Sequence, residues 1–365
     1  MEKNYKTYHV KNFYNGEEKL EQVVVGVQDG LIKKIKNQGY ESKNAFDIIV
    51  PTFIDLQVYG CEGRLFSEFP DMKTLEIMEN FHRENGTYFF QPTIASLSNE
   101  TIYKSIEAIK KYKNKYPESG CVGLHIEGPW FNLKKKGAHK EEYIHSPTEE
   151  EVDKLVEMSK GIISMITLAP EVVKKSLMEK LVSEGIILSV GHSECSYKLA
   201  NKLFGKVVSS ATHLFNAMPK IHHRKPNLTS AILLNENVYS SIIADGFHVD
   251  FELIKIAHKL KKNKLFCITD AVTETKTGPY LHKKTGAYFY NNGVLSGSSI
   301  TMSETFKNLI NKVGLSVKEA INMCSIIPSQ AIHKLKNKTK LKIGKAARFN
   351  VLDNKFNLIR SGYFR

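Results

Sequence analysis

Short apolar runs alternate with longer amphipathic segments from about residue 48 to residue 338, and this alternation restricts the possible folds more than any other feature. Repeated strand and helix units of this kind build a parallel sheet that is covered by helices. Because eight runs resemble strands, we predict a (β/α)8 barrel, whose chemistry takes place at the carboxyl ends of its strands. An open, doubly wound sheet is the alternative, but no Gly-x-Gly-x-x-Gly motif follows the first run. The predicted strands are 48–58, 88–93, 121–126, 164–168, 186–190, 207–212, 240–244 and 265–269.

The two ends of the chain have a different pattern. Near the N-terminus, the strand-like segments 8–13, 22–28 and 31–35 are separated by the turn dipeptides Asn15-Gly16 and Asp29-Gly30. Near the C-terminus, strand-like segments flank Asp353-Asn354 in the same way. We therefore predict that residues 1–47 and 339–365 together form a small β-sandwich beside the barrel, which takes residues 48–338.

Helix starts can be predicted from the spacing of polar residues. Ser146 with Glu149, and Ser316 with Glu319, each have the spacing of a capping box. The lysine-rich stretches 110–115 and 255–264 also contain apolar residues at helical spacing, so we expect them to be the outer faces of amphipathic helices. In the second helix, the residues predicted to face the core are Ile254, Ala257 and Leu260.

The net charge is +14, from 52 Lys and Arg against 38 Asp and Glu, and it could attract nucleic acid, anionic lipid or a small anionic substrate. The richest clusters lie on the helix faces described above, and no basic stripe interleaved with aromatic residues is present. We therefore predict no nucleic-acid partner. A basic, non-catalytic barrel that binds an acidic partner is the alternative from a different functional class.

The five cysteines are scattered and include no Cys-x-x-Cys motif, which argues against a disulfide framework and against a zinc knuckle. Residues 1–10 are polar and charged, and no run approaches the roughly 20 apolar residues that a membrane span needs. We expect a soluble, cytoplasmic protein that makes no contact with a membrane.

Three potential metal ligands follow predicted strands. Glu127 closes the third strand, His192 the fifth and His213 the sixth, so all three can meet at one mouth of the barrel. Any one of them alone is more often a hydrogen-bonding residue, but three at matching strand ends favour a catalytic metal site with an open position for water. Imidazole and carboxylate ligands fit zinc, iron, manganese or cobalt.

Asp270 ends the eighth predicted strand and is the candidate acid and base. A carboxylate beside a metal can accept a proton from the attacking water and return it to the leaving group. The competing interpretation is a helix N-cap. The following segment, 274–286, lacks a helical pattern, which weakens the N-cap interpretation.

Other polar residues lie in loops on the same side of the predicted barrel. His139 and His248 could polarise a carbonyl or stabilise an oxyanion, although surface histidines are common. Arg224 follows the sixth strand and could hold an anionic group with its planar guanidinium. A turn at Gly297 precedes a predicted helix and could offer backbone N–H groups to a ligand.

Taken together, these motifs resemble those of the N-acetylglucosamine-6-phosphate deacetylases, within the amidohydrolase superfamily. The resemblance runs through nearly the whole chain, and segments 123–130 and 211–219 are its most specific parts. It implies a barrel beside a small β-sandwich, a homodimer, and hydrolysis of N-acetylglucosamine 6-phosphate to glucosamine 6-phosphate and acetate in amino-sugar catabolism. Another amidohydrolase, such as an N-acyl-amino-acid deacylase or a cyclic amidase, is the second candidate.

The resemblance also implies roles for individual residues. Glu127, His192 and His213 would bind a divalent metal, zinc foremost, and Asp270 would be the general acid and base. Arg224 would hold the phosphate of a phosphorylated amino sugar. The implied substrate-binding residues are Ala138, His139, Asn216, Ala217, Arg224, His248, Leu295, Ser296 and Gly297.

Some positions depart from the superfamily pattern. Gln57 and Tyr59 occupy the place of the usual His-x-His motif at the end of the first strand, and no lysine ends the fourth strand. A second metal would need these groups, so we predict a single metal ion, with Gln57 available to orient a water molecule beside it. Thr52 also replaces the glycine that usually follows Pro51.

Overall fold

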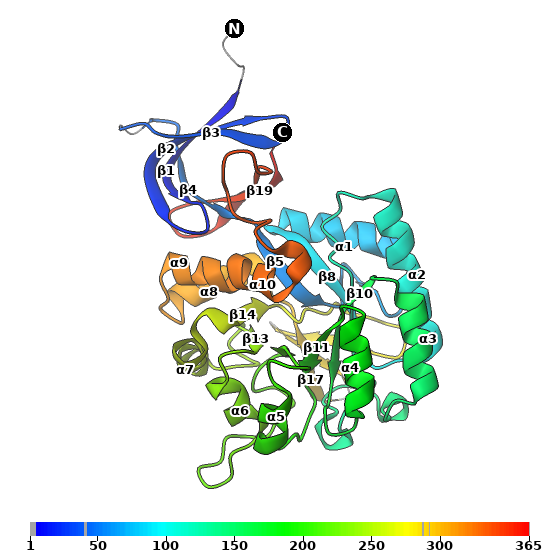
Figure 1. Ribbon diagram of the computed structural model, residues 1–365. Coiled ribbons are helices and arrows are strands. Elements are labelled where there is room, and N and C mark those ends of the chain that lie inside the picture. The colour runs from blue at the N-terminus through cyan, green and yellow to red at the C-terminus, as the bar shows by residue number, and fades with distance from the viewer. Residues whose placement is uncertain (1–4, 40–41, 287, 292, 365) are drawn as a thin grey trace.

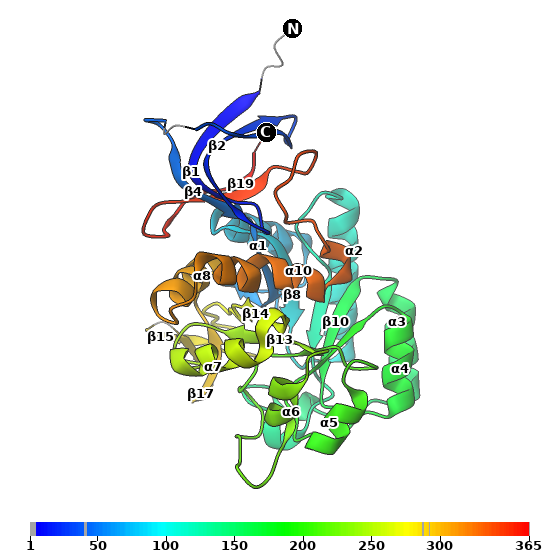
Figure 2. The same ribbon diagram turned by 60° about the vertical axis from the view of Figure 1, so that its left-hand side comes forward.

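The computed structural model describes residues 5–39, 42–286, 288–291 and 293–364. A parallel sheet of eight strands forms the centre of the larger domain, and a smaller sheet built from both chain ends lies at one side of it (Figures 1 and 2). The eight strands, in sheet order, are β5 (Phe53–Val58), β8 (Thr87–Ile94), β9 (Leu124–Glu127), β10 (Ile163–Leu168), β11 (Ile187–Val190), β12 (Ser210–Ala211), β13 (Tyr239–Ile243) and β14 (Leu265–Ile268).

The sheet closes into the predicted barrel. A parallel bridge joins Val58 to Ala271, and the Asp270 N–H donates to the Gln57 carbonyl at 3.0 Å. Each of the eight predicted strands overlaps a different strand of this sheet, so the (β/α)8 prediction is confirmed. Because all eight strands are parallel, their carboxyl ends open at one face of the barrel.

The prediction of one strand over residues 48–58 is wrong. β4 (Phe46–Pro51) pairs with β1 and β18 in the small sheet, whereas the barrel strand β5 begins at Phe53. Thr52 lies between them, accepts a hydrogen bond from the Tyr88 N–H at 3.0 Å and donates to the Gly86 carbonyl at 3.2 Å. Both strands are largely buried, so the apolar run continues across the change of sheet.

Helices cover the outside of the barrel (Figures 1 and 2). The capping box predicted at Ser316 and Glu319 is confirmed at the start of α9. The box predicted at Ser146 and Glu149 is wrong, because Thr148 caps α3 and places three glutamates in its first turn, next to the positive end of the helix dipole. The α-helices are α1 (Met72–Glu84), α2 (Asn99–Lys115), α3 (Glu149–Ser159), α4 (Lys175–Ser183), α5 (Tyr197–Leu203), α6 (Leu228–Leu234), α7 (Phe251–Lys261), α8 (Met302–Asn311), α9 (Val317–Ile321) and α10 (Ile327–Ala331).

The orientation of α7 differs from the prediction at Leu260, which is 47% exposed. Lys261 is buried in its place and donates to the carbonyls of Ile232, Asn235 and Val238, at or after the end of α6. These carbonyls need donors that α6 cannot supply, and the lysine ammonium provides them. The rotation leaves an apolar stripe on the exposed face of α7, formed by Leu253, Ile256 and Leu260.

The small sheet contains both chain ends, as predicted. Its order is β19–β18–β4–β1–β2–β3. A bridge between Leu31, at the start of β3, and Ala346, just before β18, shows that the sheet curls so that β3 approaches the segment before β18. Residues from both ends, including Phe13, Val25 and Phe349, share one apolar core. The remaining bounds are β1 (Lys6–Tyr14), β2 (Lys19–Gln28), β3 (Leu31–Asn37), β18 (Arg348–Leu352) and β19 (Leu358–Tyr363).

Some of the smaller elements lie at the carboxyl face of the barrel. Two short strands follow β5, and a three-stranded sheet lies between β14 and α8. Segment 274–286 contains no helix, as predicted. Leu295, Ser296 and Gly297 lie in β17, where Leu295 and Gly297 pair with β16, so the predicted turn is wrong there. The short elements are β6 (Gly60–Cys61), β7 (Arg64–Leu65), β15 (Lys283–Thr285), β16 (Tyr288–Asn291), β17 (Val294–Ser298), η1 (Leu133–Lys135), η2 (Glu141–Tyr143), η3 (Lys262–Lys264), η4 (Asn322–Ile326) and η5 (His333–Leu335).

Within the described parts of the chain, none of the helices combines the length and the apolar character needed to cross a bilayer.

Candidate active site

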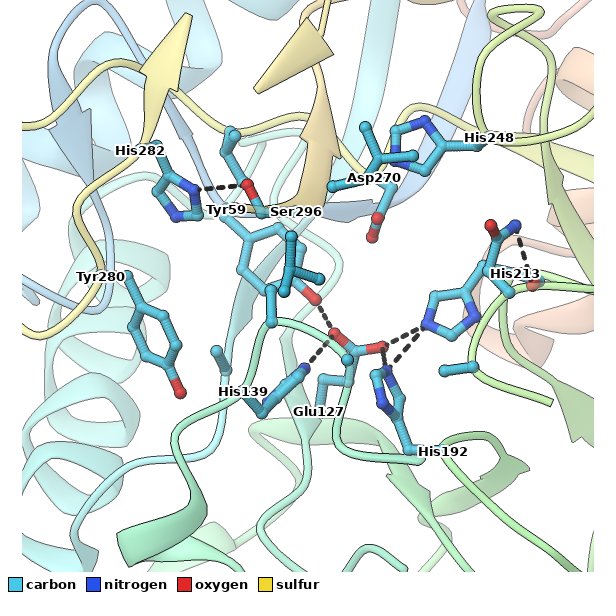
Figure 3. A pocket seen from close by; sticks show the side chains of 18 of the residues that line it. Tyr59, Glu127, His139, His192, His213, His248, Asp270, Tyr280, His282 and Ser296 are labelled. Carbon is cyan, nitrogen blue, oxygen red and sulfur yellow. Dashed lines mark hydrogen bonds and ion pairs between the residues drawn. The ribbon is translucent and has the colours of Figure 1, made fainter. Parts of the chain in front are cut away.

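A cavity lies at the carboxyl ends of the barrel strands, where the predicted site residues gather (Figure 3). Two of the predicted residues, Arg224 and Gly297, are not part of its lining. The predicted residues that line it are Glu127, Ala138, His139, His192, His213, Asn216, Ala217, His248, Asp270, Leu295 and Ser296. Side chains that are far apart in the sequence therefore share one cavity.

Three of these residues have an unusual backbone conformation. His192, His213 and Asp270 have φ angles of 49°, 36° and 54°, in the left-handed region, and each follows a barrel strand closely. This conformation costs an L-residue other than glycine roughly 1–2 kcal/mol. Such strain persists where the surrounding structure enforces it, and it concentrates at functional sites.

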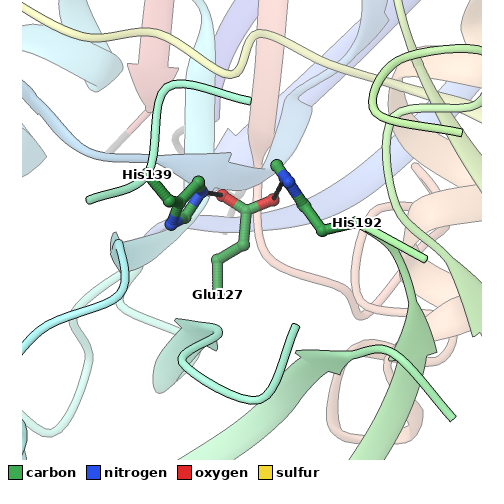
Figure 4. A group of neighbouring side chains, drawn as sticks. All are labelled: Glu127, His139 and His192. Carbon is green, nitrogen blue, oxygen red and sulfur yellow. Dashed lines mark ion pairs between the residues drawn. The ribbon is translucent and has the colours of Figure 1, made fainter. Parts of the chain in front are cut away.

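Glu127 is the centre of the cluster and is 2% exposed. Its Oε1 atom lies 2.9 Å from His213 Nε2 and 3.4 Å from His192 Nε2, and its Oε2 atom lies 3.5 Å from His139 Nε2 (Figures 3 and 4). Burial acts to raise the pKa of this carboxyl, but its close contacts with the three imidazoles hold the pKa well below its usual range. The glutamate is therefore an anion at neutral pH.

The cluster fits a divalent metal ion. The Nε2 atoms of His192 and His213 are 3.1 Å apart, so these atoms and Glu127 Oε1 form a triangle with sides of 2.9 to 3.4 Å. Ligand atoms about 2.0–2.1 Å from a tetrahedral zinc ion are roughly 3.3 Å apart, which matches this triangle. A second combination, Glu127 with His139 and His192, also brings its ligand atoms within 4.8 Å of one another.

Hydrogen bonds to the Nδ1 atoms of His192 and His139 show which nitrogen of each ring could bind a metal. His192 Nδ1 lies 2.8 Å from the Lys135 carbonyl, which can only accept, so Nδ1 carries the proton and Nε2 presents its lone pair. The Ser96 N–H instead donates to His139 Nδ1 at 3.1 Å, so the neutral His139 ring carries its proton on Nε2. His139 therefore points an N–H group, not a ligand lone pair, at Glu127.

The histidine pKa values agree in part with metal binding. Burial lowers the pKa of His192 to about 4, which keeps it neutral, as a metal ligand must be. Burial also acts to lower the pKa of His213, but the hydrogen bond to Glu127 raises it overall, so a proton would compete with a metal there. The buried Nδ1 atom of His213 has no hydrogen-bond partner among the described residues, and nothing next to it selects a tautomer.

Asp270 lies next to this cluster and is held by Gln57. The Gln57 Nε2 group donates to Asp270 Oδ1 at 2.7 Å and to Glu127 Oε1 at 3.1 Å. Burial and the negative charge of Glu127 raise the pKa of Asp270, so its carboxyl can hold a proton more readily than an exposed aspartate. The Tyr59 hydroxyl donates to Glu127 Oε2, on the side away from His192 and His213.

His248 approaches the cavity from the loop after β13. Its Nδ1 atom lies 2.6 Å from Asp245 Oδ2, and the other oxygen of Asp245 accepts the backbone N–H groups of Phe247 and His248. An acceptor at Nδ1 places the ring proton there and leaves Nε2 as the free atom. His248 therefore suits a substrate hydroxyl, whereas His139 suits a carbonyl oxygen.

Tyr280 and His282 also line the cavity and were not predicted. The Tyr280 hydroxyl donates to the Ser96 carbonyl at 2.7 Å, and His282 Nδ1 lies 2.9 Å from Ser296 Oγ. Both belong to the segment after β14 that has no periodic pattern, so nothing in the sequence placed them at the barrel mouth. The histidine in this irregular segment was the single available signal.

Arg224 lies on an exposed segment between β12 and α6, outside the cavity lining. A long loop of this part of the chain projects from the body of the protein (Figure 1). The lining residues that the structure describes include no lysine or arginine. Gly297 lies just behind Asp270, where an added Cβ atom would come within 2.8 Å of the Asp270 carbonyl.

Comparison with known proteins shows the family to which the chain belongs. The chain is 36% identical to N-acetylglucosamine-6-phosphate deacetylase from Haemophilus influenzae over 77% of this chain and 76% of the relative. It is 29% identical to N-acetylgalactosamine-6-phosphate deacetylase from Shewanella sp. (strain ANA-3), over 78% and 74% of the two chains. The crystal structure of N-acetylglucosamine-6-phosphate deacetylase from Pasteurella multocida matches with a TM-score of 0.89 and 31% identity, covering 98% of both chains. A family model described as "Amidohydrolase family" matches residues 48–362, and the chain belongs to this family.

Proposed function

We propose that this protein hydrolyses the N-acetyl group of N-acetylglucosamine 6-phosphate to give glucosamine 6-phosphate and acetate. The observation that supports this proposal most strongly is the meeting of Glu127, the Nε2 atoms of His192 and His213, and Asp270 in one buried cavity of an amidohydrolase barrel. Relatives named for deacetylation of phosphorylated amino sugars point to the same substrate class.

We propose that Glu127 Oε1 and the Nε2 atoms of His192 and His213 hold a single divalent ion, zinc foremost, with iron, manganese or cobalt compatible with the same ligands. The triangle of these three atoms supports this ligand set. Gln57 and Tyr59 stand where a second metal would need imidazoles, and both bond to the glutamate instead. When bound, the ion would lower the pKa of a water molecule and polarise the acetyl carbonyl.

The side chains supply the proton transfers in this proposal. Asp270 takes a proton from the attacking water and delivers it to the amine as the C–N bond breaks. The Nε2–H group of His139 donates a hydrogen bond to the acetyl oxygen, where negative charge develops, and keeps its proton. The remaining proposed substrate contacts are Ala138, Asn216, Ala217, His248, Leu295, Ser296 and Gly297.

The substrate can be tested directly with purified, metal-loaded protein. We expect acetate release from N-acetylglucosamine 6-phosphate with a kcat/KM at least about tenfold above that for N-acetylglucosamine or an N-acyl amino acid. N-acetylgalactosamine 6-phosphate should be assayed in parallel, because one relative is named for it. Preference for an N-acyl amino acid or a cyclic amide would overturn the proposal and favour another amidohydrolase reaction.

We further propose that the protein is a homodimer in which Arg224 of the partner subunit meets the substrate phosphate. The lining residues that the structure describes include no lysine or arginine to meet the phosphate, while Arg224 is exposed on its loop. The exposed stripe of Leu253, Ile256 and Leu260 on α7 is the kind of surface that a second copy can cover. We also propose a cytoplasmic location, which suits a sugar phosphate and five free, buried cysteines.

Replacing Arg224 with alanine should lower kcat/KM for the phosphorylated sugar about 10- to 100-fold, because a charge-assisted bond is lost, and change the value for unphosphorylated N-acetylglucosamine less than about twofold. Lys225→Ala, at the exposed neighbouring position, is the matched control and should keep the wild-type rate. Equal losses for both sugars would remove Arg224 from the phosphate.

Co-expression tests whether the arginine acts across the dimer. Arg224→Ala and Asp270→Asn chains should be nearly inactive separately. Together they should regain about one quarter of the wild-type rate, because half of the dimers are mixed and each mixed dimer has one complete site. A mixture no more active than its components would place Arg224 in its own subunit's site.

A further inference from the structure

A buried carboxylate, Asp55, lies at the closing seam of the barrel and has no part in the chemistry described so far. It is on β5 and 0% exposed. Its Oδ2 atom accepts a hydrogen bond from Thr269 Oγ1 at 2.5 Å, and its Oδ1 atom accepts the N–H groups of Thr269 at 3.2 Å and Gln57 at 3.3 Å. Burial raises the pKa of this carboxyl to about 6 despite these donors. A group that is costly to bury is usually kept for a reason other than packing.

The seam differs from the other joints of the barrel. Neighbouring strands elsewhere form ladders, whereas β14 and β5 stand at opposite ends of the sheet order. Among the described residues, the backbone links across the seam are at its carboxyl end, where Gln57 and Tyr59 contact Asp270 and Ala271. The Asp55 side chain links the two strands directly beneath this point.

Both residues that Asp55 holds are next to the proposed catalytic acid. Thr269 directly precedes Asp270, and Gln57 donates its side-chain amide to Asp270 Oδ1 at 2.7 Å. Thr269 Oγ1 also accepts the Ala271 N–H at 3.2 Å. The same hydroxyl therefore bonds both to Asp55 and to the backbone just after Asp270. Asp270 itself has the left-handed φ of 54°, a conformation that needs support from its surroundings.

We propose that Asp55 is a positioning residue that acts through Thr269 and Gln57 to hold Asp270 in its strained conformation, with its carboxylate facing Glu127. The carboxylate is required because three donors converge on two oxygens. An asparagine at this position has one acceptor oxygen, and its NH2 group would reverse the hydrogen bond to the Thr269 hydroxyl, which already accepts the Ala271 N–H. This inference rests on the proposed role of Asp270 in deacetylation.

The test is a double-mutant cycle of Asp55→Asn with Asp270→Asn. Asp55→Asn alone should lower kcat about 100-fold, as expected for a displaced catalytic group, while KM and bound metal change less than about twofold. In the Asp270→Asn background the same change should have almost no further effect on kcat. Equal losses in both backgrounds would overturn the inference, as would a folded Asp55→Asn protein with the wild-type kcat.

Two further variants keep the inference testable. Thr269→Val removes the bridging hydroxyl while it leaves Asp55 in place, and it should reproduce the loss of kcat if Asp55→Asn fails to fold. Ser325→Ala is the control, because Ser325 is fully buried and bonds the Thr52 carbonyl at 2.8 Å without a link to Asp270. It should leave kcat unchanged in both backgrounds.

A measurement without turnover separates this inference from the proposed function. Hydrogen–deuterium exchange of the peptide that covers residues 269–271 should become faster in Asp55→Asn and stay at the wild-type rate in Ser325→Ala. If the wild-type protein deacetylates no amino sugar but the exchange rises, the proposed function fails and the positioning role stands. Unchanged exchange in Asp55→Asn would overturn the positioning role, whatever the substrate.

Discussion

Replacing Asp270 with asparagine should lower kcat for acetate release by about 10³-fold, within the 10²- to 10⁴-fold range that general acid–base catalysis supplies. The amide keeps the size of the carboxylate and can still accept the Gln57 hydrogen bond, but it cannot take a proton from water or pass one to the amine. Because the proposed metal ligands are other side chains, bound metal should stay at the wild-type level. Acetate release and metal content measure the two effects.

The pH dependence gives a second readout for the same variant. A general base works when it is deprotonated, so kcat/KM should fall as the pH drops through the pKa of Asp270, which burial and Glu127 raise. This acid limb should be absent from the residual activity of Asp270→Asn. Asp153→Asn, on the exposed face of α3, should behave as wild type. Unchanged turnover in Asp270→Asn would rule out the proposed role.

Replacing His213 with alanine should weaken metal binding by more than about 100-fold and should abolish turnover at limiting metal. Loss of a residue that only hydrogen-bonds to a metal ligand costs up to about 100-fold in affinity, and loss of a ligand itself should cost more. His139→Ala is the matched comparison, because His139 also contacts Glu127, at 3.5 Å, and belongs to the alternative ligand set. It should keep its metal and lose activity, since its Nε2 atom carries a proton. Metal titration of both variants measures the difference.

The opposite pattern would change the assignment of the site. If His139→Ala lost the metal and His213→Ala kept it, the ligand set would be Glu127, His139 and His192. Chelation of the wild-type protein provides the reference state, because it should remove activity without unfolding the barrel. Full activity in demetallated protein would contradict a metal-dependent reaction altogether.

The local pattern of the sequence was sufficient for the barrel and for the centre of its site. Eight apolar runs predicted eight strands, and parallel strands with helical connections leave all their carboxyl ends at one face. Glu127, His192, His213 and Asp270 could therefore be expected to meet, because each ends or follows a strand at that face. The prediction was weaker where periodicity was absent, as at Tyr280 and His282, and where two helix faces were both apolar, as at Leu260.

By itself, then, the sequence determined the order of strands, the closed barrel and the residue types at its mouth. The strands follow from hydrophobic periodicity, and their order follows because consecutive strands with short helical connections become neighbours in the sheet. The tertiary structure alone decided which nitrogen of His139 faces Glu127, where the chain changes sheet at Thr52, and how Asp55 joins the barrel seam. These features depend on partners far along the chain, such as Ser96 for His139 and Thr269 for Asp55. A hydrogen bond between distant residues has a direction and a geometry that local sequence patterns do not contain.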